Sequence, residues 1–524
     1  MSHPLLAITV AGCLSLAVAS APAQAEKVTL TTNDGTYSVI GELTEITDNA
    51  FTITSALGPV TIRRDTVSCA GTGCPDGSGA TTEEVRIVGD RALGIGLLPI
   101  LLGQYAGQKG GKTTMLETLD GAFLVELSGG EFADRSAIKI VPGVSTDGIS
   151  ALLDGSAEMA LSDRRALTRE VRAARNLDLG DLHSKALEQI IALDGLVFLT
   201  HPSNSVRSIT LADAVLIFSG LITNWSDIGG PDKPITVYTS TPDLGSADVL
   251  DTLVMRPKNL KVTPGAVLLG SDRVVADAVA KDPTAFGYAR IGNEAPARAM
   301  SIRGTCGIQT VPTAFTVKTE EYPLTRKLYL YRTQKPLSDI GQGFSDFLLS
   351  DQAQVDVAEA GFIDQAIITA SPDQQTLRLA SAMLIGTDAA LQAELRKMVD
   401  ALANAQQLSA TFRYETGTDS LNARALIDLD RLGALLSSPA YAGKEALFLG
   451  FTDTVGDDDL NRELSQERAE QVISALLQIY PKLIDNVRLT AVGHGEVMSL
   501  ACNDTDAGRA INRRVEVWVR DVPQ

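Results

Sequence analysis

The feature that most constrains the fold is an alternation of strand-like and helix-like patterns from residue 85 to residue 366. It begins with the apolar run VRIV at residues 85–88, which Gly89 ends, and continues with the helical pattern LGIGLLPILLGQYA at residues 93–106. Repeated strand and helix units favour an α/β domain built on a mostly parallel sheet. Ligands of such sheets bind beyond the carboxyl ends of the strands.

Residues 27–67 follow a different pattern. Apolar and polar residues alternate in short runs (VTLTT, TYSVIGELTEI, AFTITS and GPVTIRR), and turn-forming Asn, Asp and Gly residues separate them. Alternation with a period of two predicts a meander of hairpins. We expect residues 26–80 to form a small β-barrel-like module, with a spacer or docking role as the default.

The chain has five cysteines, and their spacing is informative. Cys69 and Cys74 lie in the glycine-rich loop SCAGTGCPDG, where a local disulfide closes easily in an oxidising compartment. Zinc is a weaker alternative, because no ligand cluster lies nearby. Cys306 and Cys502 are far apart in the sequence, so they either bridge two domains or remain as buried thiols.

The first 25 residues read as a secretory signal. An apolar stretch at residues 5–18 precedes Ala23-Gln24-Ala25, a pattern that predicts cleavage after Ala25. Residues 10–13, ending in Cys13, offer a second, lipoprotein-type processing site. No later apolar run reaches the about 18 residues that a membrane helix needs. We therefore expect an exported, soluble protein of the periplasm.

Composition excludes several function classes. With 64 acidic and 45 basic residues, the formal net charge is −19, which argues against a nucleic-acid partner because phosphate binding draws on clustered Lys and Arg. No nucleophile has a neighbouring His motif, and no metal-binding signature appears. We expect no enzymatic activity, no cofactor and no metal site.

Two further segments complete the chain. Residues 375–408 carry Leu, Met and Ala at helical spacing, so a helical connector is expected at residues 372–405. Residues 406–524 again alternate between strand and helix patterns, which predicts a compact α/β domain. Its central helix is expected over residues 464–480, with Leu464, Val472 and Leu476 on one face.

Residues 84–366 resemble the type II periplasmic solute-binding proteins, in particular the phosphate-binding components of ABC transporters. Four stretches carry the resemblance: IFSGLITNWSDIGGPDKPITVY at 217–238, DPTAFGYARIG at 282–292, YPLTRKLYLY at 322–331 and FSDFLLSDQAQ at 344–354. The family implies two lobes that are linked by crossover strands and close over a small anion. Loop amides and hydroxyl groups would hold that anion.

By motif, the resemblance places ligand contacts at Ser145, Thr146, Ser162, Asp163, Gly245 and Ser246. The chain departs from the family at Asp90 and Ala92, which stand where the family has hydroxyl residues, and in lacking the arginine that precedes the loop at residues 244–246. A carboxylate at Asp90 would oppose a phosphate dianion. A cleft that binds another solute, or contacts a protein, is therefore an equal alternative to phosphate binding.

Residues 406–524 resemble the peptidoglycan-binding domain of the OmpA family. The matching stretches are FRYETGTDSL at 412–421, GFTDTVGDDDLNRELSQERAEQV at 450–472, VGHG at 492–495 and NDTDAGRAINRRVEVWV at 503–519. In that family an Asp and an Arg clasp the diaminopimelate of the cell-wall peptide. The motif places these roles on Asp453 and Arg468, with Asn461 at the helix entry and Arg513 in the terminal basic run.

The residue types of Asp453 and Arg468 also suit this ligand on chemical grounds alone. The free end of diaminopimelate carries an ammonium and a carboxylate on one carbon, so an acceptor anion and a planar bidentate donor can hold it. The rival interpretation is a salt bridge between Asp453 and Arg468 that only holds the loop. Asp457, Asp458 and Asp459 are expected to favour the helix N-terminus rather than contact ligand.

The sequence thus predicts a multidomain α/β protein with a small β module, a two-lobed type II binding-protein fold, a helical connector and an OmpA-like domain. The favoured function is non-covalent anchoring to peptidoglycan in the periplasm, near the outer membrane, combined with a solute-receptor module. The alternatives are an anion-binding component of an ABC uptake system and a structural adaptor that contacts envelope proteins.

Overall fold

The computed structural model describes residues 27–522, with gaps at residues 33–36, 48–49, 56–57, 72, 75–82, 119, 133–135, 243–244, 372–374, 377, 381, 383–388, 403, 415–420 and 422. The predicted signal sequence lies outside the described residues. The chain divides into two compact units, residues 1–82 with 116–120 and the remainder. Within the described residues, no helix is long and apolar enough to cross a membrane.

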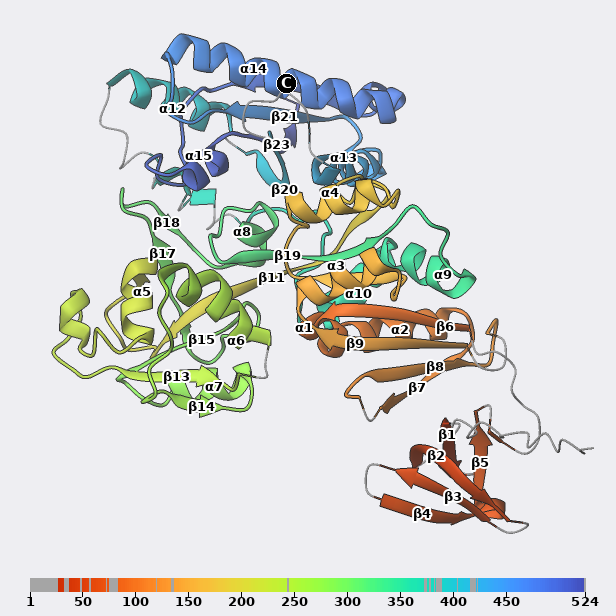
Figure 1. Ribbon diagram of the computed structural model, residues 1–524. Helices are drawn as coiled ribbons and strands as arrows, with labels where there is room; N and C mark the ends of the chain where they lie inside the picture. Colours follow the sequence, from red (N-terminus) through yellow and green to blue (C-terminus); the bar gives the residue numbers. More distant parts are fainter. Residues whose placement is uncertain are drawn as a thin grey trace, which may run out of the picture. The chain divides into compact units, whose positions relative to one another are not determined.

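The first unit contains a five-stranded antiparallel sheet in the order β4-β3-β2-β1-β5 (Figure 1). Its strands are β1 (Lys27–Thr32), β2 (Ser38–Ile46), β3 (Ala50–Ser55), β4 (Gly58–Arg63) and β5 (Val67–Ala70). The alternation in the sequence places one apolar face inward, where Val28, Leu30, Phe51 and Ile53 are buried.

The barrel-like closure expected for this module is not formed by the described strands, because the end strands β4 and β5 do not pair with each other. Cys69 and Cys74 do form a disulfide, with Cα atoms 5.8 Å apart. It closes the loop after β5, and Cys74 packs into the small core.

The second unit begins with lobe A, which we define as residues 83–115, 121–195 and 325–366. Its strands are β6 (Glu83–Asp90), β7 (Lys112–Glu117), β8 (Phe123–Ser128), β9 (Ser136–Gly143) and β10 (Met159–Ser162). Its helices are α1 (Arg91–Gly96), α2 (Leu98–Gln108), α3 (Ser145–Asp154), α4 (Thr168–Asn176), α9 (Asp339–Leu348) and α10 (Asp351–Glu359). The expected strand and helix at residues 85–106 are thus present, and the helical stretch is divided between α1 and α2.

Lobe B comprises residues 196–324. Its strands are β12 (Ser208–Ile209), β13 (Thr236–Ser240), β14 (Val267–Leu269), β15 (Ala285–Arg290), β16 (Arg298–Ala299), β17 (Ser301–Arg303) and β18 (Gln309–Thr310). Its helices are α5 (Leu211–Phe218), α6 (Gly245–Leu250), α7 (Asp272–Val279) and α8 (Ala314–Lys318). Buried aromatic side chains fill its core, among them Phe198, Phe218, Trp225 and Phe286.

Two long strands join the lobes, β11 (Glu188–Thr200) and β19 (Thr325–Arg332). Every residue of β11 is buried, and its two halves pair antiparallel with β19 in lobe A and β15 in lobe B. The result is one continuous sheet, β14-β13-β15-β11-β19-β10-β6-β9-β8-β7. The expected mostly parallel sheet is therefore mixed: β6, β9 and β10 are parallel, but the crossover strands are antiparallel.

The C-terminal domain is a four-stranded sheet in the order β20-β23-β21-β22. The strands are β20 (Gln406–Arg413), β21 (Lys444–Phe451), β22 (Arg488–Gly493) and β23 (Arg514–Asp521), and the helices are α12 (Ala389–Ala401), α13 (Ala423–Leu436), α14 (Asp458–Ile479) and α15 (Asp506–Asn512). One sheet face, with Phe412, Phe448 and Val517, packs against α13 and α14.

Within the expected connector at residues 372–405, α12 packs on this domain. α12 ends at Ala401, Asn404 adopts a left-handed conformation with φ 65°, and residues 406–408 are already in β20. Leu395, Met398 and Leu402 pack on the second sheet face, against Leu447, Leu449 and Trp518. The sheet is therefore covered on both faces.

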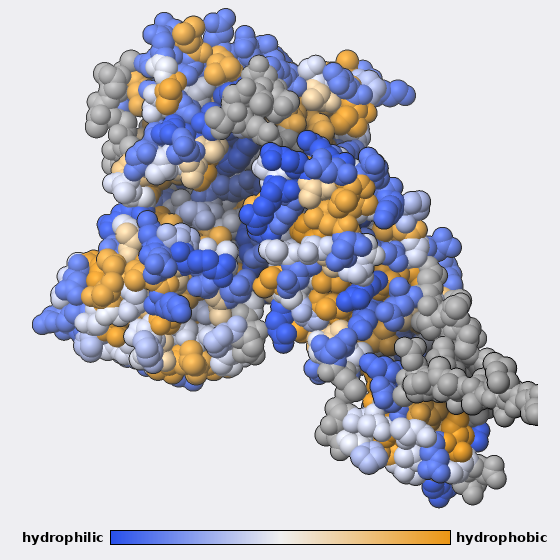
Figure 2. Space-filling view, in the orientation of Figure 1, coloured by the Kyte–Doolittle hydropathy of each residue, from blue (hydrophilic) through white to orange (hydrophobic). Residues whose placement is uncertain are grey.

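The C-terminal domain contacts both lobes (Figure 1). On the side of lobe A, Arg431 Nη1 of α13 donates to Gln365 Oε1 at 3.0 Å. The segment that follows lobe A then joins β20, where Ser409 N donates to Ile368 O at 2.8 Å. On the side of lobe B, Cys306 and Cys502 form a disulfide with Cα atoms 5.6 Å apart. The surface is hollowed where these parts meet, and hydrophilic side chains line the hollow (Figure 2).

A buried ionic network also crosses this junction. Arg378 contacts Glu321 of lobe B at 3.4 Å and forms an ion pair with Glu516 of β23, which Arg514 contacts at 2.5 Å. Burial lowers the pKa of Arg514 to about 10. Burial alone would raise the pKa of Glu516, but Arg378 and Arg514 lower it overall.

Candidate functional site

The first group of candidate residues lies at the end of β21. Asp453 follows this strand, and its two carboxylate oxygens accept hydrogen bonds from Val455 N at 3.0 Å and from Arg513 Nη1 at 2.6 Å. Asn461, in the first turns of α14, reaches the Asp453 carbonyl at 3.5 Å. The structure therefore brings together Asp453, Asn461 and Arg513.

Arg468 comes from the next turns of the same helix and takes a different position. Its guanidinium lies over the ring of Tyr414 at 5.1 Å, and the Tyr414 hydroxyl donates to Arg468 O at 2.7 Å. A cation held on an aromatic face keeps its charge while it is partly desolvated. The rival interpretation above was a salt bridge between Asp453 and Arg468. Among the described residues, the ion pair of Asp453 is with Arg513.

Both residues are buried: Asp453 is 7% exposed and Arg468 is 8% exposed. Exposed apolar residues lie beside them, Val455 in the loop and Leu460 in the first turn of α14. A cavity of about 340 Å³ adjoins the loop and is lined by Thr454, Glu496 and Asn503, together with apolar residues and the Cys306–Cys502 disulfide.

The helix α14 begins six residues earlier than the sequence predicts, at Asp458 rather than residue 464. The cause is the side chain of Asp457, which accepts from Asp459 N at 3.0 Å and from Leu460 N at 3.4 Å. Asp458 and Asp459 fill the first turn, where negative charge is favourable. Asp457 thus caps the helix, and Asp458 and Asp459 favour its N-terminus, as expected.

The terminal basic run has divided roles. Asn512 accepts from Leu500 N and Ala501 N and donates to Ala501 O and Asn503 Oδ1, so it fixes the loop after β22. Arg514 is buried over Phe451, 4.2 Å from the ring. Arg509 donates to Asn503 O at 2.8 Å. Of this run, Arg513 alone forms an ion pair with Asp453 among the described residues.

The second group of candidate residues faces the cleft from lobe A. Ser145 donates to the Asp163 carboxylate and accepts from Asp163 N at 3.0 Å. Ser162 donates to Arg164 O at 2.6 Å, and Thr146 accepts from Arg164 Nη2 at 3.2 Å. The hydroxyl groups assigned to a ligand by motif therefore already have partners within the protein.

Lobe B contributes Gly245 and Ser246 at the start of α6. Ser246 Oγ donates to Asp272 Oδ1 at 2.5 Å and lies 3.0 Å from Ser240 Oγ. Burial raises the pKa of Asp272. A Cβ atom on Gly245 would lie 2.4 Å from Ala92 Cβ, so glycine permits this close approach of the two lobes.

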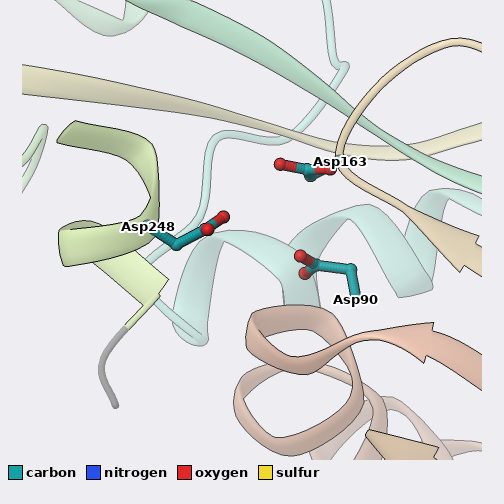
Figure 3. Close-up of side chains that lie close together, drawn as sticks. All are labelled: Asp90, Asp163 and Asp248. Carbon is teal, nitrogen blue, oxygen red and sulfur yellow. The ribbon is translucent and has the colours of Figure 1, made fainter. Parts of the chain in front are cut away.

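Three carboxylates meet across the cleft. Asp90 and Asp163 of lobe A and Asp248 of α6 have oxygens within 4.8 Å of one another (Figure 3). Asp90 also accepts from Leu93 N at 2.9 Å and caps α1. Burial raises the pKa of Asp90 to about 6, although Arg326 opposes this shift.

Arg326 lies against this acidic cluster. Its guanidinium is 3.1 Å from Asp163, 3.1 Å from Asp194 and 3.7 Å from Asp248, and its side chain is 4% exposed. Two like charges about 4 Å apart repel by about 4 kcal/mol at an effective dielectric constant near 20. Each ionised carboxylate of this cluster would repel a phosphate dianion, and Arg326 would attract it.

Asp248, Arg326 and Arg290 were not among the residues selected from the sequence. Arg326 lies inside the stretch YPLTRKLYLY, at the start of a crossover strand. Its position could therefore have identified it as a cleft residue. Arg290 likewise lies inside the stretch DPTAFGYARIG. Asp248 reaches the cleft only through the pairing of β13 with β15 and of β15 with β11, which no local pattern reveals.

Comparisons with known proteins agree with both resemblances. Residues 75–352 match the family described as PBP superfamily domain, and residues 413–513 match the OmpA family. One curated relative is the phosphate-binding protein PstS of Borreliella burgdorferi, which is 25% identical over 224 residues, covering 42% of this chain and 76% of that protein.

Two solved structures are similar to separate parts of the chain. A phosphate transport receptor of ABC type from Vibrio cholerae has 22% identity and a TM-score of 0.40, covering 53% of this chain and 99% of that one. The cell wall anchor of the T6SS from Pseudomonas aeruginosa has 25% identity and a TM-score of 0.19, covering 25% and 97%. The match to the PBP superfamily domain spans more than half of this chain. The chain therefore belongs to the PBP superfamily, and it carries a C-terminal domain of the OmpA family.

Proposed function

We propose that this protein is an envelope protein of the periplasm that is held non-covalently to peptidoglycan by its C-terminal domain and presents a solute-binding module. The observation that carries the proposal is the group formed by Asp453, Asn461 and Arg513, which offers a carboxylate, an amide and a guanidinium beside one loop. Arg468 follows about two turns further along the same helix, over the ring of Tyr414. The OmpA-family match supports it.

The chemistry fits a zwitterionic amino-acid end. Asp453 would accept the ammonium of diaminopimelate in the stem peptide, and Arg468 would bind its carboxylate. Arg513 holds the Asp453 carboxylate in place before ligand arrives. The apolar side chains of Val455 and Leu460 offer a surface to the aliphatic part of the peptide.

Retention on purified cell-wall sacculi tests this anchor. We expect Asp453→Asn and Arg468→Ala each to lower retention at least about tenfold, because each removes one charged contact. Asp459→Asn and Arg462→Ala are matched controls in the same region, since both side chains are exposed. Wild-type retention in the Asp453 and Arg468 variants would refute the proposal.

A second candidate function is the receptor of an ABC-type uptake system for phosphate or a related small anion. It is favoured by the PBP superfamily match and by a relative that is a phosphate-binding protein. Calorimetry of the intact protein with inorganic phosphate tests it. A cleft with no heat of binding up to millimolar phosphate would favour the alternative of a structural adaptor for envelope proteins.

A further inference from the structure

The cleft contains a second compartment beside the acidic cluster. A cavity of about 440 Å³ lies between α1 of lobe A and α6, α7 and β15 of lobe B. Three arginines line it: Arg91 at the start of α1, Arg273 in the first turn of α7 and Arg290 at the end of β15. Its volume is in the range of sites for small organic ligands.

The position of Arg290 is fixed from several sides. Its guanidinium lies over the Phe362 ring at 4.6 Å, and its Nε is 3.7 Å from Asp194. Its backbone N donates to Asp272 at 3.1 Å. A Cβ atom on Gly245 would lie 2.7 Å from Arg290 Nη2, so the glycine leaves the space in which this nitrogen sits. Arg290 is therefore a prepositioned donor at the boundary of the two lobes.

Arg91 and Arg273 differ from Arg290 in their surroundings. Both are exposed, and neither forms an ion pair within the part of the chain that the structure describes. They come from opposite lobes, so a ligand that contacted both would hold the lobes together. Ile95 and Gly96 of α1 give the cavity an apolar wall.

We propose that this basic cavity binds a small organic anion, one with a phosphate or carboxylate group on a short carbon skeleton. The three guanidinium groups would bind the charged group, because their planar forks match both kinds of oxyanion. The apolar wall would contact the carbon skeleton. Beside Asp163, to which the resemblance assigns a contact with the family's anion, Asp90 and Asp248 add two further carboxylates within 4.8 Å.

This inference rests on the solute-receptor part of the proposed function and is independent of the peptidoglycan anchor. It makes the cleft selective for an organic anion over inorganic phosphate. It also makes the ligand contacts different from Ser145, Thr146, Ser162 and Asp163, whose polar groups are engaged within lobe A.

Calorimetry of the intact protein with glycerol 3-phosphate, succinate and inorganic phosphate tests the proposal. We expect one of the two organic anions to bind about tenfold or more tightly than inorganic phosphate. Arg91→Ala and Arg273→Ala should each weaken that binding by about tenfold, as expected for loss of a charged hydrogen-bond donor. Arg169→Ala removes an exposed charge elsewhere in lobe A and should leave the affinity unchanged.

Two results would overturn the inference. One is binding that persists in Arg91→Ala and Arg273→Ala but is lost in Ser145→Ala, which would place the anion at the family's position and leave the receptor proposal intact. The other is that neither organic anion binds more tightly than inorganic phosphate. Retention on sacculi, measured with the same variants, reports on the anchor separately and should not change.

Discussion

Arg513 and Asp453 form an ion pair at 2.6 Å across 60 residues of sequence, and neither side chain is more than 15% exposed. The pair joins the loop after β21 to the residue that precedes β23. The carboxylate at the centre of the candidate peptidoglycan site is thus oriented by a residue of the terminal basic run and not by the helix α14.

The first prediction concerns this pair. Arg513→Ala should lower retention on sacculi by about tenfold, because the Asp453 carboxylate loses a charged hydrogen bond that sets its direction. Arg513→Lys should recover part of the loss, since it restores the charge without the planar fork. Arg488→Ala, an exposed arginine of β22, is the control. Equal retention in Arg513→Ala and the wild type would show that the pair has no part in binding.

The second prediction concerns the disulfide between lobe B and the C-terminal domain. Replacing Cys306 and Cys502 by Ser should lower the free energy of unfolding by about 5 kcal/mol, because the bond spans a sequence separation of 196 residues and so closes a long loop in the unfolded chain. Removing the Cys69–Cys74 bond, with a separation of 5, should cost much less. Urea unfolding of both double variants tests this, and equal losses would contradict it.

The third prediction follows from the raised pKa of Asp90, about 6 against an ordinary value of 3.8. Between these values the folded protein binds more protons than the unfolded chain, so its stability falls as the pH rises through this window. The expected slope is about 1.4 kcal/mol per pH unit, on the order of 3 kcal/mol in total.

Asp90→Asn cannot titrate and should lack this contribution. The stability of the wild type, relative to Asp90→Asn, should therefore increase as the pH is lowered from 7 to 4. Chemical unfolding at half-unit pH intervals measures the difference. A constant difference across this range would mean that the carboxylate is ionised throughout, held so by Arg326.

The fourth prediction concerns the buried network at the junction. Glu516→Gln should destabilise the protein by about 3–5 kcal/mol, because it leaves the guanidinium groups of Arg378 and Arg514 in the interior without their shared carboxylate. The exposed pair of Arg175 and Asp181 is the comparison, and Asp181→Asn should cost at most about 1 kcal/mol. Similar losses for the two variants would contradict the assigned role of the network.

Much of the architecture could be predicted from local patterns. The alternation of apolar and polar residues at 27–67 predicted strands, and the alternation of strand and helix patterns after residue 85 predicted the α/β domain. Both predictions depend on the periodicity of residues within single elements. The start of α14 was misplaced, although Asp457 followed by two further aspartates is a helix-start signal that could have been read.

The candidate sites were harder to predict, because their geometry depends on contacts between distant segments. Residue types at the peptidoglycan site followed from the motif, but the pairing of Asp453 with Arg513 depends on how β21 and β23 are placed in the sheet. The acidic cluster depends on the approach of α6 to α1, which Gly245 permits. The open alternative for Cys306 and Cys502 is resolved as a bridge between domains.

The packing of α12 on the second face of the C-terminal sheet has a practical consequence. A fragment that starts at residue 413, where the OmpA-family match begins, would lack α12 and would expose Leu447, Leu449 and Trp518 to solvent. Each large apolar side chain that becomes exposed lowers the free energy of unfolding by about 1.5–3 kcal/mol. A recombinant fragment of the C-terminal domain should therefore start upstream of Ala389, so that α12 still covers this apolar face of the sheet.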